Sequence, residues 1–290
     1  MKRALATIAI CAVAVPVLAQ DGTADWAMVR DARNKLTVAY TRFDNGLGIA
    51  TRCLDGSYQA LITGLPPAGR HETRTLRVAY GDEDMHDQRW SVAIDDTVAV
   101  SDLPAPFARR LREGGRLRVL VPGAAEGGRN LVYDLTLPAS RASIDETLTV
   151  CDRPLTDPRD AELAALPEGG LPAELTWAEQ PRPVFPQPML FARGYAVVMC
   201  LTNPDGSLRD CSVEAEHPQE GRFGDAALRA SRRARVANVG DPTAPVAPAR
   251  ILYRNQFIVN GYQTREDQER IRAQRRQERE ARQRREPRAQ

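Results

Sequence analysis

The residues best suited to carry chemistry in this chain of 290 residues are five cysteines and three histidines. Thiolates and imidazoles bind zinc, but structural zinc sites need them at short and regular spacings. The histidines His71, His86 and His217 are scattered along the chain, and no pair of cysteines has the Cys-x-x-Cys spacing. This pattern argues against a zinc site, and we predict no metal and no cofactor.

Catalysis needs a base beside a nucleophile or a metal, and the first half of the chain offers two candidates. His71 stands next to Glu72, and His86 follows the acidic segment 81–85. That segment lacks the ligand spacing of a calcium loop, and neither a Gly-x-Ser-x-Gly nor a His-Glu-x-x-His motif occurs. We therefore expect no catalytic residue. A hydrolase-type enzyme housed in the N-terminal part remains the alternative.

The N-terminus has the pattern of a secretory signal peptide. Lys2 and Arg3 precede an apolar stretch that ends in Val17-Leu18-Ala19, so we predict a signal over residues 1–19 with cleavage after Ala19. The competing interpretation is an uncleaved membrane anchor. A spanning helix needs about 20 apolar residues, whereas this stretch is shorter and is interrupted by Pro16. The expected location is the periplasm of a bacterial cell envelope.

Export would place the remaining cysteines in an oxidising compartment. Cys11 leaves with the signal, and an even number then remains, which favours disulfides. Four cysteines allow three connectivities. We select Cys53–Cys151 and Cys200–Cys211, because each bond would then lie within one domain.

The chain has the length of two domains, and a stretch rich in proline, 154–181, separates them. Proline lacks an amide donor and resists helix formation, so we interpret this stretch as a linker that contains at most one short helical turn near 160–166. Residues 20–153 alternate short apolar runs with turns such as Asp44-Asn45-Gly46. That pattern predicts a mostly-β domain of unknown function, a small sandwich or an open barrel.

Residues 263–290 form a tail of arginine, glutamate and glutamine. It contains ten arginines and six acidic residues, a net charge of +4, while the whole chain has a formal charge of +2. The tail has almost no apolar residues, so a coiled coil is not expected and the tail is helical or disordered. Its charge also suits contact with an anionic surface. The composition gives no indication of nucleic-acid binding.

The part of the chain between 182 and 262 has the most informative pattern. An apolar run at 194–202, a turn, and a second run at 208–214 are followed by a basic helix at 223–236 and a last run at 251–259. The order predicts a β-β-α-β domain, and therefore an α+β protein overall. One face of the helix should bear Phe223, Ala227, Ala230 and Ala234, while Arg229, Arg232, Arg233 and Arg235 lie elsewhere.

The hairpin between the first two runs carries Cys200 and Cys211. Side chains alternate between the two faces of a strand, so an even loop places both cysteines on one face. An odd loop such as Pro204-Asp205-Gly206 would separate them. The disulfide therefore predicts an even loop.

Several residues of this region resemble the C-terminal domain of the TonB family of energy transducers. Pro183-Val184-Phe185-Pro186 corresponds to the family's Pro-aromatic element, Gly194 to the glycine that opens the first strand, and Asp205-Gly206 to the turn. The helix start Phe223-Gly224-Asp225-Ala226-Ala227-Leu228 and the strand from Ile251 to Val259 complete the match. The resemblance covers about residues 182–262, under a third of the chain.

The resemblance implies a protein that captures an extended peptide by adding it to an exposed strand. We expect the docking edge on the last strand, with four side chains directed away from the helix: Leu252, Arg254, Gln256 and Ile258.

The expected partner is a protein, such as a peptide of an outer-membrane receptor, with a link to TonB-dependent transport. Loss of the N-terminal helix would make the chain a periplasmic adaptor and not a transducer. The alternatives are an envelope-associated structural protein and the enzyme considered above.

Overall fold

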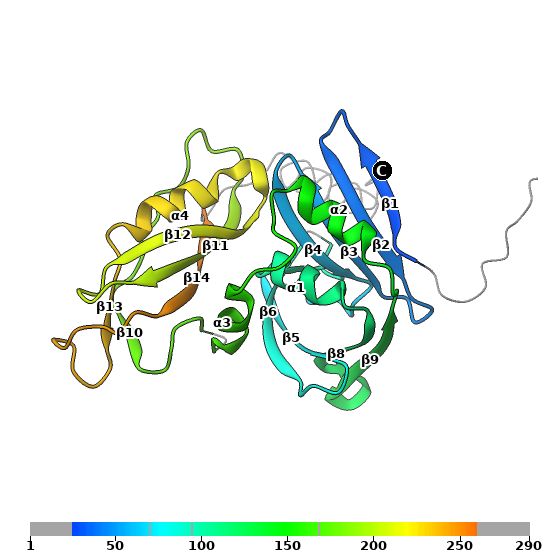
Figure 1. Ribbon diagram of the computed structural model, residues 1–290, viewed down its shortest axis with the longest axis horizontal. Helices are drawn as coiled ribbons and strands as arrows, with labels where there is room; N and C mark the ends of the chain where they lie inside the picture. The colour runs from blue at the N-terminus through cyan, green and yellow to red at the C-terminus, as the bar shows by residue number, and fades with distance from the viewer. Residues whose placement is uncertain (1–24, 70, 94, 168, 260–290) are drawn as a thin grey trace, which may run out of the picture.

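The computed structural model describes residues 25–69, 71–93, 95–167 and 169–259 (Figure 1). Every helix within these ranges is too short or too polar to cross a lipid bilayer. The predicted signal, the anionic-surface contact and the tail at 263–290 lie outside the described residues.

The first domain contains nine strands and two helices. The strands are β1 (Ala27–Asp31), β2 (Leu36–Arg42), β3 (Gly48–Leu54), β4 (Ser57–Thr63), β5 (Thr73–Tyr80), β6 (His86–Val92), β7 (Ala99–Ser101), β8 (Gly115–Ala125) and β9 (Arg129–Leu137). The helices are α1 (Pro104–Leu111) and α2 (Ala142–Val150), with a short 3₁₀ turn, η1, at Glu126–Gly128.

All nine strands form one sheet in the order β1-β2-β3-β4-β7-β6-β5-β8-β9. The sheet curls around a core to which α1 and α2 contribute Leu111, Ile144 and Leu148 (Figure 1). Trp90 is fully buried in this core and meets Phe107 edge to face at 5.0 Å. Because β1 and β9 do not pair, the sheet is not a closed barrel. It is one open, curved sheet.

The second domain follows the predicted β-β-α-β order with one additional short strand, β13, between the helix and the last strand. Its elements are β11 (Arg193–Thr202), β12 (Leu208–His217), the 3₁₀ turn η2 (Gln219–Gly221), α4 (Phe223–Ser231), β13 (Arg235–Asn238) and β14 (Arg250–Ile258). The three long strands form an antiparallel sheet in the order β12-β11-β14, so β14 is an edge strand. The α+β class is correct in this coarse form.

Helix α4 packs on one face of this sheet through Phe223, Ala226, Ala227 and Ala230, which are all buried. Phe223 stacks near Phe257 with ring centroids 4.6 Å apart. Gly194 makes room for this ring, because an added Cβ would lie 2.1 Å from Phe223. The small residues of the helix let it lie close to the strands, as the sequence pattern predicts.

The predicted helix extends too far toward the C-terminus. It ends at Ser231, and residues 235–238 form β13 instead. The physical reason is pairing with β10 (Leu175–Glu179), which buries Val236 and Ala237 in a two-stranded sheet. This long-range pairing overrides the local preference for helix.

The Pro-rich segment 154–181 contains ordered elements that pack on both domains. Besides β10 it forms α3 (Arg159–Ala165), in the region where the sequence allows a helical turn. Figure 1 shows α3 between β14 and the first domain. The segment therefore does not behave as an extended spacer.

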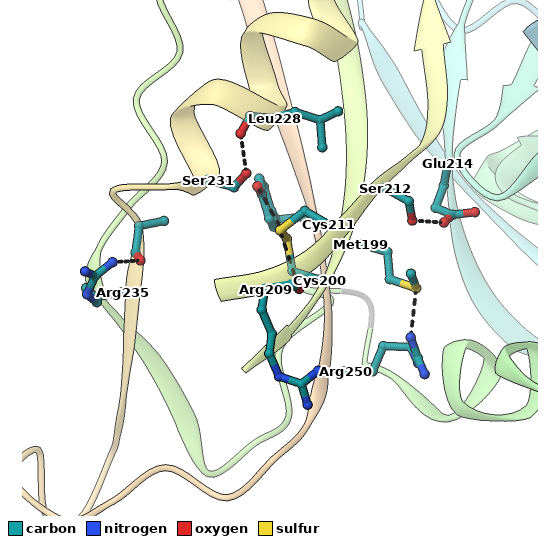
Figure 2. Close-up of a disulfide and its surroundings, with 12 residues drawn as sticks. Met199, Cys200, Arg209, Cys211, Ser212, Glu214, Leu228, Ser231, Arg235 and Arg250 are labelled. Carbon is teal, nitrogen blue, oxygen red and sulfur yellow. Dashed lines mark hydrogen bonds between the residues drawn. A yellow bond between two sulfur atoms is a disulfide. The ribbon is translucent and has the colours of Figure 1, made fainter. Parts of the chain in front are cut away.

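The structure joins Cys53 to Cys151 and Cys200 to Cys211. The second bond lies below α4, while Met199, the neighbour of Cys200, points toward Arg250 (Figure 2). The prediction of an even hairpin loop is wrong, however. Asn203 donates its amide to Ser207 O, which leaves the odd loop Pro204-Asp205-Gly206.

A bulge in β12 reconciles this odd loop with the disulfide. The register changes between Leu201–Arg209 and Met199–Ser212, and Asp210 has a left-handed φ of 49°. One extra residue shifts the following residues to the opposite face of the strand. Cys211 therefore stands opposite Cys200, with a Cα–Cα distance of 4.1 Å.

Candidate functional site

Both faces of the β12-β11-β14 sheet are covered within this chain. The face opposite α4 carries a buried apolar cluster to which β11, β12, β14 and α3 contribute. Its buried members are Leu163, Tyr195, Val197, Met199, Ala215 and Leu252, with Leu103 of the first domain packed against them. This face is thus a domain interface, and within the described residues this sheet offers an outside partner its strand edges and not a face.

A buried ion pair crosses this interface beside the apolar cluster. Arg254 Nη1 lies 2.6 Å from Asp102 Oδ1 of the first domain, and both side chains are less than a tenth exposed. Arg254 also donates to Ser91 Oγ at 2.5 Å, and its guanidinium lies 3.7 Å from the centre of the Tyr195 ring. Arg89 approaches the other Asp102 oxygen at 3.3 Å. These contacts fix β14 to the first domain.

A second charged network ties α3 to both domains. Arg159 bridges Asp157 at 2.7 Å and the buried Glu214 of β12 at 3.2 Å. Arg109 of α1, itself buried, bonds Asp160 at 2.5 Å. Because Arg109, Arg159 and Glu214 belong to three different elements, the network holds α1, α3 and β12 in one arrangement.

The four side chains predicted to form the docking edge have different surroundings. Leu252 is buried in the interface cluster, and Arg254 is occupied by Asp102. Gln256 is exposed and donates to Glu72 of the first domain. Ile258 is 48% exposed. The expectation that all four face a partner is therefore corrected for Leu252 and Arg254, because the first domain and α3 cover the face onto which they project.

The backbone of β14 is more open than its side chains. The Thr202 amide donates to Ala249 O, so the odd-numbered residues of β14 pair with β11. The Leu252 amide points the other way and donates to Gly170 O at 2.7 Å. Strand geometry then directs the N–H and C=O groups of Arg254, Gln256 and Ile258 outward as well. Among the described residues, none forms a backbone hydrogen bond with these outward groups.

The residues considered for catalysis do not come together as a site. His86 starts β6 and is exposed, and His71 lies in the loop before β5. Two acidic residues near His86 form ion pairs with arginines: Glu83 lies 2.7 Å from Arg110, and Asp87 lies 3.0 Å from Arg77. Within the described ranges no group of three or more His, Cys, Asp or Glu residues is arranged to hold a metal ion.

The third histidine lies in the domain interface, where the sequence offers no signal for it. His217 Nδ1 is 3.5 Å from Gln59 Nε2, and its ring centre is 6.0 Å from that of Tyr195. Burial lowers the pKa of His217, and the charges of Arg52 and Arg254 lower it further, while Glu220 opposes them. The imidazole is therefore harder to protonate in the folded chain than in the unfolded one.

This shift predicts a loss of stability in mild acid. As the pH falls below about 6.5, the unfolded chain binds a proton at His217 before the folded chain does, so the free energy of unfolding decreases. Urea unfolding of wild type and His217→Gln at pH ~7.5 and ~5.5 measures this. We expect a smaller loss in His217→Gln, and the full loss in the control His86→Gln. Equal losses in wild type and His217→Gln would contradict the prediction.

Asp102, Glu72 and Gly170 are the residues of this region that the sequence pattern misses. Asp102 and Glu72 are ordinary acidic residues of the first domain, more than 150 positions before their partners on β14. Gly170 belongs to a Gly-Gly pair in the Pro-rich segment, which signals a turn but not its neighbour.

Comparison with known proteins gives weak likenesses to two solved structures. A solution NMR structure of the Pseudomonas aeruginosa TonB CTD matches with 16% identity and a TM-score of 0.27, over 31% of this chain and 92% of that one. A crystal structure of invasion associated protein b from Bartonella henselae matches with 14% identity and a TM-score of 0.33, over 44% of this chain and 94% of that one. No protein-family model and no curated protein matches the sequence.

Proposed function

We propose that this chain is an exported binding protein without catalytic activity, which captures an extended segment of a partner protein along the outer edge of β14. The observation that carries the proposal is the row of outward backbone groups at Arg254, Gln256 and Ile258, which have no backbone partner among the described residues. An unpaired edge of this kind is a template for a further strand.

The remainder of the fold supports an edge that is ready to bind. β14 is paired with β11 along its whole length, and the Arg254–Asp102 ion pair holds it against the first domain. A strand that is already fixed loses little conformational entropy when a partner adds to it. The role of the first domain would then be to hold β14 in the conformation that accepts a partner strand.

Binding of this kind tolerates many peptide sequences, because backbone groups supply most of the contacts. A segment of an outer-membrane receptor is the partner that we propose, in connection with TonB-dependent transport. The two disulfides suit the periplasm, an oxidising compartment in which they form and persist.

Substitution of Gln256 by proline tests the edge directly. Proline removes one outward N–H, and an edge strand tolerates it where that N–H faces away from the ladder. One lost hydrogen bond of about 0.5–1.5 kcal/mol should weaken peptide binding by up to about tenfold. The probe is a set of fluorescent peptides of about seven residues selected on the full chain from a random display library, with binding measured by anisotropy.

Gln256→Ala is the matched control, because it removes the same side chain and keeps the amide. It should bind the selected peptides within about twofold of wild type, with circular dichroism confirming that both variants fold. If Gln256→Pro and Gln256→Ala bind equally well, strand addition at β14 is excluded.

A further inference from the structure

We infer that the open edge of β14 accepts a partner in one fixed register. The register is limited at one end by the loop around Gly170, the stop, and is set at the other end by the exposed side chain of Ile258, the anchor. The partner segment is then short, extended, and equipped with a large apolar side chain that reaches the region of Ile258. This inference rests on the proposed function and adds to it the length and chemistry of the segment.

The stop is a close approach of backbone to backbone. Gly170 accepts the Leu252 amide at 2.7 Å, which occupies the position where an added strand would pair. Gly170 has a φ of 72°, and a Cβ on it would lie 1.9 Å from Leu252 O. Only glycine combines this conformation with this distance.

The loop that carries the stop is itself held in place. The Gly170 amide donates to Pro167 O at 2.7 Å, and the Leu175 amide donates to Pro172 O at 3.0 Å. Prolines on both sides restrict the backbone further. An incoming strand therefore pairs only from Arg254 onward and must end or turn away at Gly170.

The open part of the edge is short. Two residues separate successive outward groups, so Arg254, Gln256 and Ile258 provide three paired positions. At about 3.3 Å per residue, a partner of about five to six residues fills this length. The site thus fits a short linear segment and not a complete strand of a folded sheet.

The far end of β14 carries an exposed apolar side chain. Ile258 is 48% exposed. Its neighbour Phe257 points to the face that α4 covers, where its ring lies 5.9 Å from that of Phe185. Because successive residues of a strand alternate between its faces, Ile258 projects from the opposite face.

A partner residue opposite Ile258 would place its Cβ about 5 Å away, which is within reach of that side chain. We therefore assign a large apolar residue to this position of the partner.

The stop can be tested without any ligand. Hydrogen exchange of the full chain, followed by NMR, should show a protected Leu252 amide beside rapidly exchanging amides at Arg254 and Gln256. Gly170→Ala should raise the exchange rate at Leu252. Its matched control, Gly169→Ala, should not, because a Cβ there meets no atom within 4 Å. Rapid exchange of Leu252 in wild type would overturn the stop.

The anchor is tested with the random peptide library and the full chain. Peptides selected on wild type should share one position enriched in large apolar residues, and Ile258→Lys should lower their affinity at least about fivefold. Val239→Lys is the matched control, because Val239 is 60% exposed and lies after β13. It should leave the affinity unchanged.

The two proposals fail in different ways. The anchor would be overturned, and strand addition supported, by one combination of results. In it, Gln256→Pro lowers the affinity of the selected peptides, Ile258→Lys leaves it unchanged, and the peptides share no position enriched in large apolar residues. If Gln256→Pro leaves the affinity of the selected peptides unchanged, or if the library yields no binder, both strand addition and the anchor are overturned. Occupation of the edge by the chain's own tail would appear as slow exchange at Gln256 that disappears when residues 263–290 are deleted, and it would overturn the proposed partner.

Discussion

Asp102→Ala is expected to lower the free energy of unfolding by about 3–5 kcal/mol, the cost of leaving one partner of a buried ion pair without the other. The variant leaves the Arg254 guanidinium more than nine-tenths buried against Tyr195, with Ser91 Oγ as its remaining partner from the first domain. Urea unfolding of the full chain measures the change. The same variant should open the domain interface, which limited proteolysis detects in the segment 154–181.

Two comparisons make this expectation specific. Glu72→Ala removes a partly exposed carboxylate whose ion pair with Arg193 has N and O atoms 3.7 Å apart, and it should cost less than about 1 kcal/mol. The double variant Asp102→Ala/Arg254→Met removes both charges and should recover much of the lost stability. A loss for Asp102→Ala as small as that for Glu72→Ala would show that the pair does not hold the domains together.

Loss of the Cys53–Cys151 bond has the second large effect that we expect. The bond joins residues 98 positions apart. Closing so long a loop removes much entropy from the unfolded chain, and the double variant Cys53→Ala/Cys151→Ala should lose about 4–5 kcal/mol. Thermal unfolding followed by circular dichroism measures the loss.

The second disulfide provides the control for this loop-length argument. Cys200 and Cys211 are only 11 positions apart, so Cys200→Ala/Cys211→Ala should lose about 3 kcal/mol in the same measurement. A larger loss for the short loop than for the long one would contradict the argument. The comparison is made within one chain, which keeps the compartment and the conditions equal.

The sequence predicts the second domain well where local patterns determine the structure. The apolar runs identify β11, β12 and β14, and the alanine stripe beginning at Phe223 identifies the buried face of α4. The sequence-based prediction fails where contacts between distant segments determine the structure. β13 exists because β10 pairs with it, and the bulge at Asp210 is determined by the hairpin as a whole. Neither pairing nor register is encoded in a local period.

The prediction of the docking edge is limited in the same way, because it depends on contacts with distant segments. Alternation along β14 correctly separates the side chains that face α4 from Leu252, Arg254, Gln256 and Ile258. Two members of the second set, Arg254 and Gln256, are polar, and polar residues at alternate positions of a strand suggest exposure to solvent. What covers Arg254 is Asp102, which lies 152 residues earlier in the chain. A buried charge and a solvated one look alike in a sequence, because the difference lies in the partner.

The packing of segment 154–181 bears on how the protein can be divided for laboratory work. A fragment that begins near residue 182 would lack α3 and the first domain, and it would present Tyr195, Val197, Met199 and Leu252 to water. Such a patch favours self-association. Recombinant production should therefore keep both halves on one polypeptide. Affinities measured with the C-terminal half alone would contain a contribution from non-specific binding to apolar residues that are buried in the full chain.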